Sequence, residues 1–203
     1  RGVGVLDYRF NNLDVLRAER GCLVIANHPS LLDYVLLASV MNETDCLVKS
    51  ALLRNPFVSG VIRAADYLIN SEAETLLRAS QQRLSQGDTL LIFPEGTRTR
   101  VGEAMTLQRG AANIAVRCNS AVRVVVIHCS ERMLDKQSSW YNVPPNKPVF
   151  TVDVRERINI HDFYDASQHE PALAARQLNR HMQHQLTTGL QSLSGTKDAS
   201  ALS

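Results

Sequence analysis

Four short runs of apolar, often β-branched residues along the chain predict buried strands. They are Cys22–Ala26, Thr89–Phe93, Val122–Cys129 and Val149–Val154. Polar or turn-forming residues bound each run, which favours strands that are covered on both faces rather than longer helices.

Stretches with helical periodicity alternate with these runs. The predicted helices are Pro29–Met41, residues 71–87, Gly110–Cys118 and Pro171–Leu190. Ser71 and Glu74 form a capping box, and Gly87 supplies the stop signal of the same helix. The alternation predicts an α/β fold: a single domain with a mostly parallel or mixed central sheet flanked by helices.

The chain has 203 residues, which fits one domain. Its composition, 44% hydrophobic and 21% charged residues, indicates a folded globular protein. We expect the domain to span residues 1–191. Residues 192–203 are rich in Ser, Gly and Ala and predict a flexible C-terminal tail. The segment 142–148 contains three prolines and predicts a loop.

Charge and cysteine content narrow the classes of function. A net charge of +2 is too small to indicate nucleic-acid binding. Arginines do gather at Arg98, Arg100, Arg109, Arg117 and Arg123, where they could bind anions or form an ordinary solvated surface. The four cysteines match no zinc pattern and indicate a reducing, cytoplasmic setting, and we expect no metal site.

The first polar motif follows Cys22–Ala26 and reads Asn27-His28-Pro29-Ser30-Leu31-Leu32-Asp33. If Pro29 opens a helix, His28 lies at the helix N-terminus, where the dipole favours neutral imidazole. The His28 ring could then fold back over the first turn and contact Asp33. Asp33 would fix the tautomer of a general base. Because H-x4-D is a loose pattern, the alternative interpretation is that His28 is a polar residue at the end of a strand and Asp33 a solvated helix residue. Ser30 lacks the G-x-S-x-G context of a nucleophile.

The second motif, Phe93-Pro94-Glu95-Gly96-Thr97-Arg98-Thr99-Arg100, follows the next long apolar run and should reach the same sheet edge. Gly96 allows a close approach of the backbone to a ligand. Thr97 offers a hydroxyl, and Arg98 offers a planar fork suited to phosphate or carboxylate. Glu95 could accept hydrogen bonds from a polyol or from arginine. Alone, the motif could also be a surface turn with an ion pair.

In this order and spacing, the two motifs resemble the glycerolipid acyltransferase family, which includes lysophosphatidate and glycerol-3-phosphate acyltransferases. The resemblance covers roughly residues 21–127, and Lys49, Pro56 and Gly60 also fall where the family often carries them. It implies that His28, supported by Asp33, deprotonates an acceptor hydroxyl that attacks an acyl thioester. The residues it implies for substrate binding are Asn27, Glu95, Gly96, Thr97 and Arg98. Backbone N–H groups near Gly96 or the start of the Pro29 helix are candidate donors to the oxyanion.

The resemblance also implies the partners of the protein. These are an acyl-CoA or acyl-carrier-protein donor, which is a co-substrate rather than a cofactor, a lipid acceptor and a membrane surface. The implied location is the cytoplasmic face of the inner (plasma) membrane, where the protein would be peripheral. Because the chain begins with Arg1, an upstream segment could also anchor it. Residues 50–58 mix apolar and basic side chains and are the expected interfacial segment.

Two departures from the family pattern bear on the acceptor. Residues 65–72 contain no arginine, although family members that act on glycerol phosphates usually carry one there, and Arg63 comes several residues earlier. The strand Val122–Cys129 also lacks the proline of a fourth motif. Arg123 could compensate or could simply point outward. A non-phosphorylated lipid or polyketide-like acceptor, thioester hydrolysis and a non-catalytic lipid-binding module therefore stay open.

Overall fold

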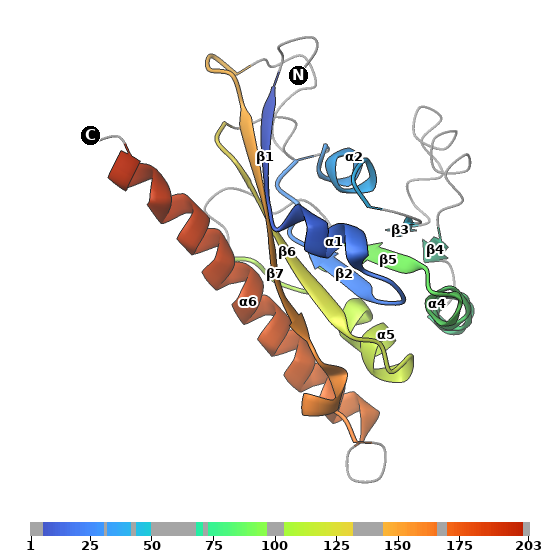
Figure 1. Ribbon diagram of the computed structural model, residues 1–203. Coiled ribbons are helices and arrows are strands. Elements are labelled where there is room, and N and C mark those ends of the chain that lie inside the picture. The colour runs from blue at the N-terminus through green and yellow to red at the C-terminus, as the bar shows by residue number, and fades with distance from the viewer. Residues whose placement is uncertain are drawn as a thin grey trace.

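The computed structural model describes residues 6–30, 32–41, 44–49, 68–70, 73–96, 104–131, 144–165 and 170–200. Within these residues the chain forms one seven-stranded sheet with helices on both faces (Figure 1). The predicted α/β fold with a mostly parallel or mixed central sheet is confirmed. No helix of the described residues is long and apolar enough to cross a membrane.

The strand order across the sheet is β1-β7-β6-β2-β5-β3-β4. The β6–β7 pair is antiparallel, whereas the other neighbouring pairs are parallel. The strands are β1 (Asp7–Asn11), β2 (Leu23–Ala26), β3 (Thr44–Lys49), β4 (Leu68–Asn70), β5 (Thr89–Ile92), β6 (Val122–Cys129) and β7 (Val149–Ile158).

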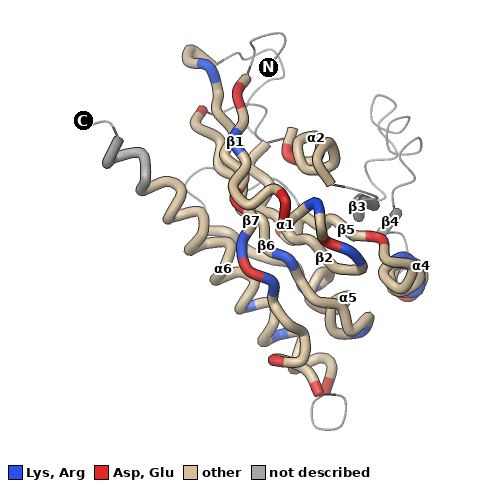
Figure 2. The backbone as a smooth tube through the Cα atoms, viewed as in Figure 1, with Lys and Arg blue, Asp and Glu red and all other residues tan. Residues whose placement is uncertain are grey.

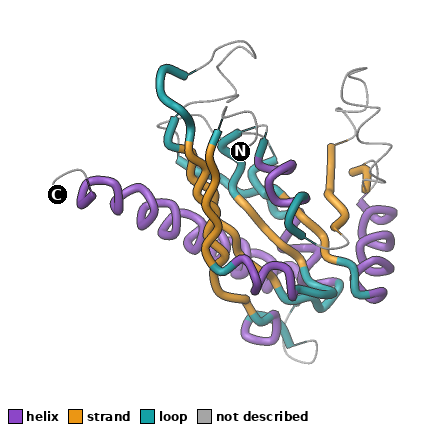
Figure 3. The backbone as a smooth tube through the Cα atoms, turned by 45° about the horizontal axis from the view of Figure 1, so that its top comes forward, coloured by secondary structure: helices purple, strands orange, loops and turns teal. Residues whose placement is uncertain are grey.

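Helices cover the two faces of the sheet, as Figure 3 shows from a second direction. The helices are α1 (Leu13–Ala18), α2 (Asp33–Ala38), α4 (Ala73–Gln86), α5 (Gly110–Arg117) and α6 (Pro171–Ser200), and a 3-10 helix, η2, spans Ile160–Asp162. Helices α1 and α2 contribute to the hydrophobic cluster on one face. Helices α4, α5 and α6 contribute to the cluster on the other.

Successive side chains of β2 explain why its sequence is apolar without alternation. Leu23 and Ile25 enter the cluster with α4, α5 and α6, whereas Val24 and Ala26 enter the cluster with α1 and α2. Because adjacent residues of a strand point to opposite faces, a strand covered on both sides needs apolar residues at every position. The buried strands predicted from the four apolar runs are therefore confirmed, although β7 continues four residues beyond the predicted Val154.

Helix α2 begins at Asp33, so the prediction that Pro29 opens this helix is wrong. The Asp33 carboxylate accepts a 2.7 Å hydrogen bond from the backbone N–H of Ser30. This local bond holds the preceding residues in a turn-like conformation and competes with an earlier helix start. His28 consequently lies five residues before the helix, and Leu32 occupies the N-cap position.

Helix α6 is longer than predicted and ends at Ser200 rather than at Leu190. Leu190 and Leu193 are half-buried against the hydrophobic cluster, so the apolar stripe of the helix continues past the predicted end. Polar and small residues next to these leucines, among them Gln191, Ser192 and Gly195, hide that stripe in the sequence. Residues 192–200 are thus helical, and the flexibility expected of this tail stays a prediction.

Candidate active site

The two polar motifs leave the sheet at the same edge. Strands β2 and β5 are parallel neighbours, with Leu23 opposite Leu90 and Ile25 opposite Ile92. The residues that follow Ala26 and Ile92 therefore emerge side by side. Parallel strands commonly present ligand-binding residues at their carboxyl ends, and this juxtaposition agrees with the prediction from sequence.

His28 and Asp33 form the polar centre of this edge. The Nδ1 atom of His28 lies 2.9 Å from the Oδ2 atom of Asp33. The Asp33 side chain is fully buried, whereas 19% of the His28 side chain is exposed. The predicted contact between His28 and Asp33 is thus present, although the helix begins at Asp33 and not at Pro29 as the prediction assumed.

This geometry assigns different roles to the two imidazole nitrogens. A carboxylate is a hydrogen-bond acceptor, so Nδ1 of His28 carries the proton that faces Asp33. In the neutral ring, Nε2 then holds the free lone pair. The partly exposed ring can use that lone pair to accept a proton from a substrate.

The second motif holds His28 through its backbone. The backbone N–H of His28 donates a 2.8 Å hydrogen bond to Oε1 of Glu95. Glu95 is only 5% exposed. The Phe93 ring stacks on the imidazole, with ring centroids 4.4 Å apart and planes inclined by 28°. Together, Glu95 and Phe93 fix the position of His28, and neither contact could be read from the sequence pattern.

The side chain of Asn27, directly after β2, forms two hydrogen bonds with the backbone of β6. Its Nδ2 atom donates to the Ile127 carbonyl and its Oδ1 atom accepts from the Ile127 N–H, both at 2.7 Å. Asn27 is 3% exposed. Its contacts give it a positioning role just before His28, whereas the substrate contact expected for it stays a prediction.

The donors proposed for an oxyanion are engaged within the described residues. The Gly96 N–H donates to the Phe93 carbonyl at 2.9 Å. The Ser30 N–H donates to Asp33, and the Leu32 N–H donates to the Ser30 hydroxyl at 3.3 Å. Gly96 itself adopts a φ of 66°, a conformation that favours glycine in this turn. Thr97 and Arg98, the other predicted binding residues, lie outside the described residues.

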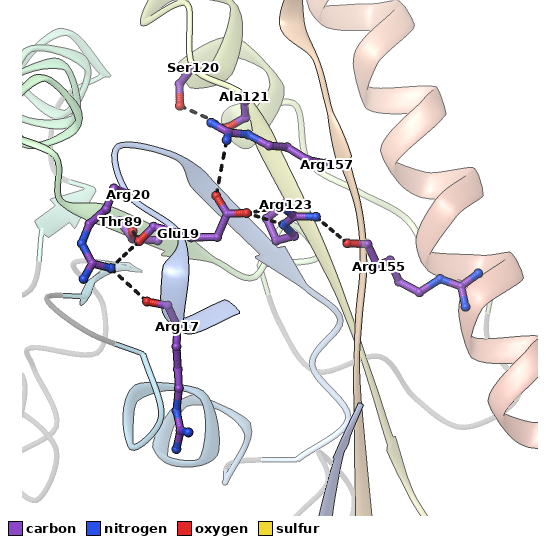
Figure 4. Close-up of polar contacts among 9 residues, drawn as sticks. All are labelled: Arg17, Glu19, Arg20, Thr89, Ser120, Ala121, Arg123, Arg155 and Arg157. Atoms are coloured by element: carbon purple, nitrogen blue, oxygen red, sulfur yellow. Dashed lines mark hydrogen bonds and ion pairs between the residues drawn. The ribbon is translucent and has the colours of Figure 1, made fainter. Parts of the chain in front are cut away.

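Arg123 does not compensate for the arginine that is absent from residues 65–72. It belongs to the first half of β6 and lies opposite Val24, which is four residues before His28 in the chain. Its Nε atom donates to Oε1 of the buried Glu19 at 2.6 Å. Figure 4 shows the Glu19 carboxylate between the guanidinium groups of Arg123 and Arg157.

The anion-binding surface suggested by clustered arginines is not continuous in the part of the chain that is described. Basic and acidic residues are interspersed along β7, where Arg155, Glu156 and Arg157 are consecutive (Figure 2). Arg155 pairs with Asp153 at 3.0 Å. Arg109 is the N-cap residue of α5 and Arg117 is its last residue, and both are exposed. Among the described residues, no group of three or more His, Cys, Asp or Glu side chains is arranged to hold a metal ion.

An α/β sheet that presents a histidine–aspartate pair beside a Phe-Pro-Glu-Gly turn is the arrangement expected of a glycerolipid acyltransferase. The chain belongs to the acyltransferase family, whose model matches residues 7–130. The family resemblance inferred from the motifs is thereby confirmed.

Several curated relatives are similar to this chain. The 1-acyl-sn-glycerol-3-phosphate acyltransferase of Helicobacter pylori is 30% identical over 112 residues, which cover 52% of this chain and 47% of that protein. A putative 1-acyl-sn-glycerol-3-phosphate acyltransferase, acl-2, of Caenorhabditis elegans is 27% identical over 198 residues, or 88% of this chain and 69% of that protein. For the bacterial relatives, the chain spans about half of their length, from 47% to 60%.

A crystal structure of similar fold is that of the 1-acyl-sn-glycerophosphate (LPA) acyltransferase, PlsC, from Thermotoga maritima. The TM-score is 0.65 at 20% sequence identity, and the match covers 93% of this chain and 73% of that chain. The likeness establishes a shared fold, which includes elements outside residues 7–130, the segment that the family model matches.

Proposed function

We propose that this protein is an O-acyltransferase that moves a fatty acyl group from an acyl-CoA or acyl-carrier-protein thioester to a hydroxyl of a lysophospholipid-type acceptor. The observation that carries the proposal is the pairing of the His28 Nδ1 atom with the fully buried Asp33 carboxylate at 2.9 Å. This pairing leaves the Nε2 lone pair of the neutral ring on the side of the imidazole that faces away from Asp33. The family membership and the relatives support the same reaction class.

In the proposed reaction, Nε2 of His28 takes the proton of the acceptor hydroxyl while its oxygen forms a C–O bond to the thioester carbonyl carbon. Asp33 stabilises the imidazolium that results. The tetrahedral intermediate then collapses, the C–S bond breaks and the imidazolium returns the proton to the departing thiolate. The products are an ester and a free thiol, and no cofactor or metal takes part.

Base catalysis by His28 should contribute about 10²- to 10⁴-fold to the rate. The rest must come from alignment of the hydroxyl with the thioester and from stabilisation of the oxyanion. Contacts to Asp33, Glu95 and Phe93 fix the imidazole before substrate binds, which reduces the ordering required in the transition state.

The decisive experiment measures thioester-dependent release of thiol by wild type and by His28→Ala, with one long-chain acyl-CoA and lysophosphatidate. We expect kcat to fall by about 10³-fold or more while the folded structure is retained. His161→Ala, which removes an exposed histidine far from this edge in sequence, is the matched control and should keep wild-type activity. Near-normal turnover by His28→Ala would refute the base assignment.

The acceptor could instead be a lipid without a phosphate. Two observations favour this second candidate: residues 65–72 lack an arginine, and Arg123 is engaged by Glu19 away from His28. An acceptor panel that pairs lysophosphatidate with the corresponding monoacylglycerol separates the two. Thiol release without any acceptor would indicate a hydrolase, and no release under any condition would indicate a non-catalytic lipid-binding module.

We further propose that the protein works at a membrane surface on the cytoplasmic side, because its lipid substrates reside there. The expected interfacial segment, residues 50–58, lies outside the described residues. Flotation with anionic phospholipid vesicles tests it through the double variant Leu53→Ser with Phe57→Ser. We expect weaker flotation, and unchanged flotation would exclude this segment as the contact.

A further inference from the structure

The long C-terminal helix α6 contacts the segment that returns from the second motif. The side-chain amide of Gln183 donates a 2.9 Å hydrogen bond to the Met105 carbonyl. One turn earlier on the same face, the Asn179 amide donates to the Leu107 carbonyl at 3.4 Å. Both donors lie beyond residue 130, where the match to the acyltransferase family ends.

The segment that receives these bonds depends on side-chain donors. Residues 104–108 are neither helix nor strand, so no ladder of backbone hydrogen bonds fixes them. Leu107 is buried, and its carbonyl needs a donor within the protein. Helix α6 is a rigid support for such donors, because Leu178, Met182 and Leu186 fix it in the core.

The same segment is bonded to the turn that holds His28. The Gln108 N–H donates to the Pro94 carbonyl at 2.8 Å. Pro94 precedes Glu95, whose carboxylate accepts the His28 N–H at 2.8 Å. A continuous series of hydrogen bonds and short backbone links therefore runs from α6 through residues 105–108 and the turn to the imidazole.

We propose that Gln183, assisted by Asn179, is a positioning residue for the reaction: it fixes residues 105–108 and thereby the Glu95 turn against which His28 is held. The inference rests on the proposed acyltransferase function for its kinetic consequence. Its structural part concerns the backbone N–H of His28 and can be measured without any substrate.

The test uses Gln183→Met, which keeps the volume and the helix propensity of the side chain and removes its donor. Gln177→Ala is the control, because Gln177 is exposed on the same helix. By NMR, amide exchange in Gln183→Met should be faster than in wild type at Gln108 and His28, by about tenfold if opening of the turn limits exchange. Exchange in the β2 amides should be unchanged.

In steady-state kinetics, Gln183→Met should lower kcat by about 5- to 20-fold. The KM values for donor and acceptor should stay within about twofold, because the position of the imidazole affects the stability of the transition state and not the binding of the substrates. A double-mutant cycle with Glu95→Ala distinguishes this path from general destabilisation. In the Glu95→Ala background, Gln183→Met should change kcat by less than about twofold, since the link to His28 is already lost.

Additive effects in the cycle, or wild-type exchange at His28 in Gln183→Met, would overturn the inference. Failure of the proposed function has a different signature, namely a wild-type protein that transfers no acyl group to any acceptor of the panel. In that case faster exchange at His28 would still support the positioning role, and unchanged exchange would refute it.

Discussion

The backbone N–H of His28 and the carboxylate of Glu95 are joined by a 2.8 Å hydrogen bond across 67 residues of sequence. The bond connects the two motifs directly: one carries His28, the proposed base, and the other carries the acceptor of its backbone N–H. Under the proposed function, Glu95 would therefore act on catalysis through the position of His28.

Replacing Glu95 with alanine should lower kcat by about 10²-fold, because the His28 N–H loses its acceptor and the imidazole loses a fixed position. The unpaired N–H should also cost about 1–3 kcal/mol of unfolding free energy. Glu95→Gln retains a carbonyl acceptor of the same length, so its losses should be smaller in both measurements. Steady-state kinetics and urea unfolding test this order, and equal losses for the two variants would contradict it.

Asp33→Asn should lower kcat by about 10³-fold or more with little change in fold. Nδ1 of His28 and the Ser30 N–H bond to the same atom, Oδ2 of Asp33, at 2.9 Å and 2.7 Å, so the amide oxygen has to take this place to keep accepting from Ser30. Nδ1 of His28 then keeps a neutral acceptor but loses the negative charge that stabilises the imidazolium formed in the proposed reaction. The pH–rate profile and the ¹⁵N shifts of the ring test this account. A variant with the wild-type profile would show that the charge of Asp33 does not matter.

The apolar pattern predicts only those strands that are covered on both faces. The predicted bounds of β2, β5 and β6 agree with the observed bounds to within one residue. Strand β1 has no fully buried residue, and its sequence, DYRFN, carries polar side chains at alternate positions. Strand β3 begins with Thr44 and Asp45 and shows no apolar run. Strand β1 lies at the edge of the sheet and β3 lies between β5 and the edge strand β4, so their conformation depends on neighbouring strands, which a local pattern does not contain.

The candidate site divides in the same way between local and distant contacts. His28 and Asp33 are five residues apart, and their contact could be predicted, although the reason given for it, a helix that begins at Pro29, is wrong. The bonds between Asn27 and Ile127 span 100 residues. Such a contact depends on strand order, and strand order cannot be read from either motif alone.

Two thiols, the buried Cys22 and the half-buried Cys118, should make the protein less stable at alkaline pH. Burial raises the pKa of the Cys118 thiol from 9.0 to about 11. Burial, followed by the hydrogen bond to Glu19 and its negative charge, also raises the pKa of Cys22. Above pH 9 the unfolded chain releases thiol protons that the folded chain keeps, so the unfolding free energy falls as pH rises towards 11.

Urea unfolding between pH 7 and pH 10.5 measures this loss. Other groups titrate in the same range, so the informative quantity is the difference between wild type and Cys118→Ala. Above pH 9 the unfolding free energy of the variant should fall less than that of wild type. Below pH 9 the difference in unfolding free energy between the two proteins should stay constant. Parallel curves over the whole range would show that the Cys118 thiol ionises equally in both states.

Two glycines of α6 should respond in opposite directions to the same substitution. A Cβ atom at Gly189 would lie 2.6 Å from Cγ2 of Val126 in β6, whereas a Cβ atom at Gly195 would meet no atom within 4 Å. Alanine raises helix propensity by about 1 kcal/mol at either position. Gly195→Ala should therefore raise the free energy of unfolding by up to about 1 kcal/mol.

At Gly189 the gain in propensity is opposed by a clash with a β-branched side chain that has little rotamer freedom. Overpacking of this kind costs about 1–3 kcal/mol, so Gly189→Ala should be neutral to destabilising by about 2 kcal/mol. Val126→Ala opens the space that the new methyl group needs, and the two substitutions should be coupled by about 1 kcal/mol in urea unfolding. Val126 precedes Ile127, the partner of Asn27, so the clash should also lower kcat. A Gly189→Ala protein as stable and active as Gly195→Ala would show that α6 does not need this close approach to β6.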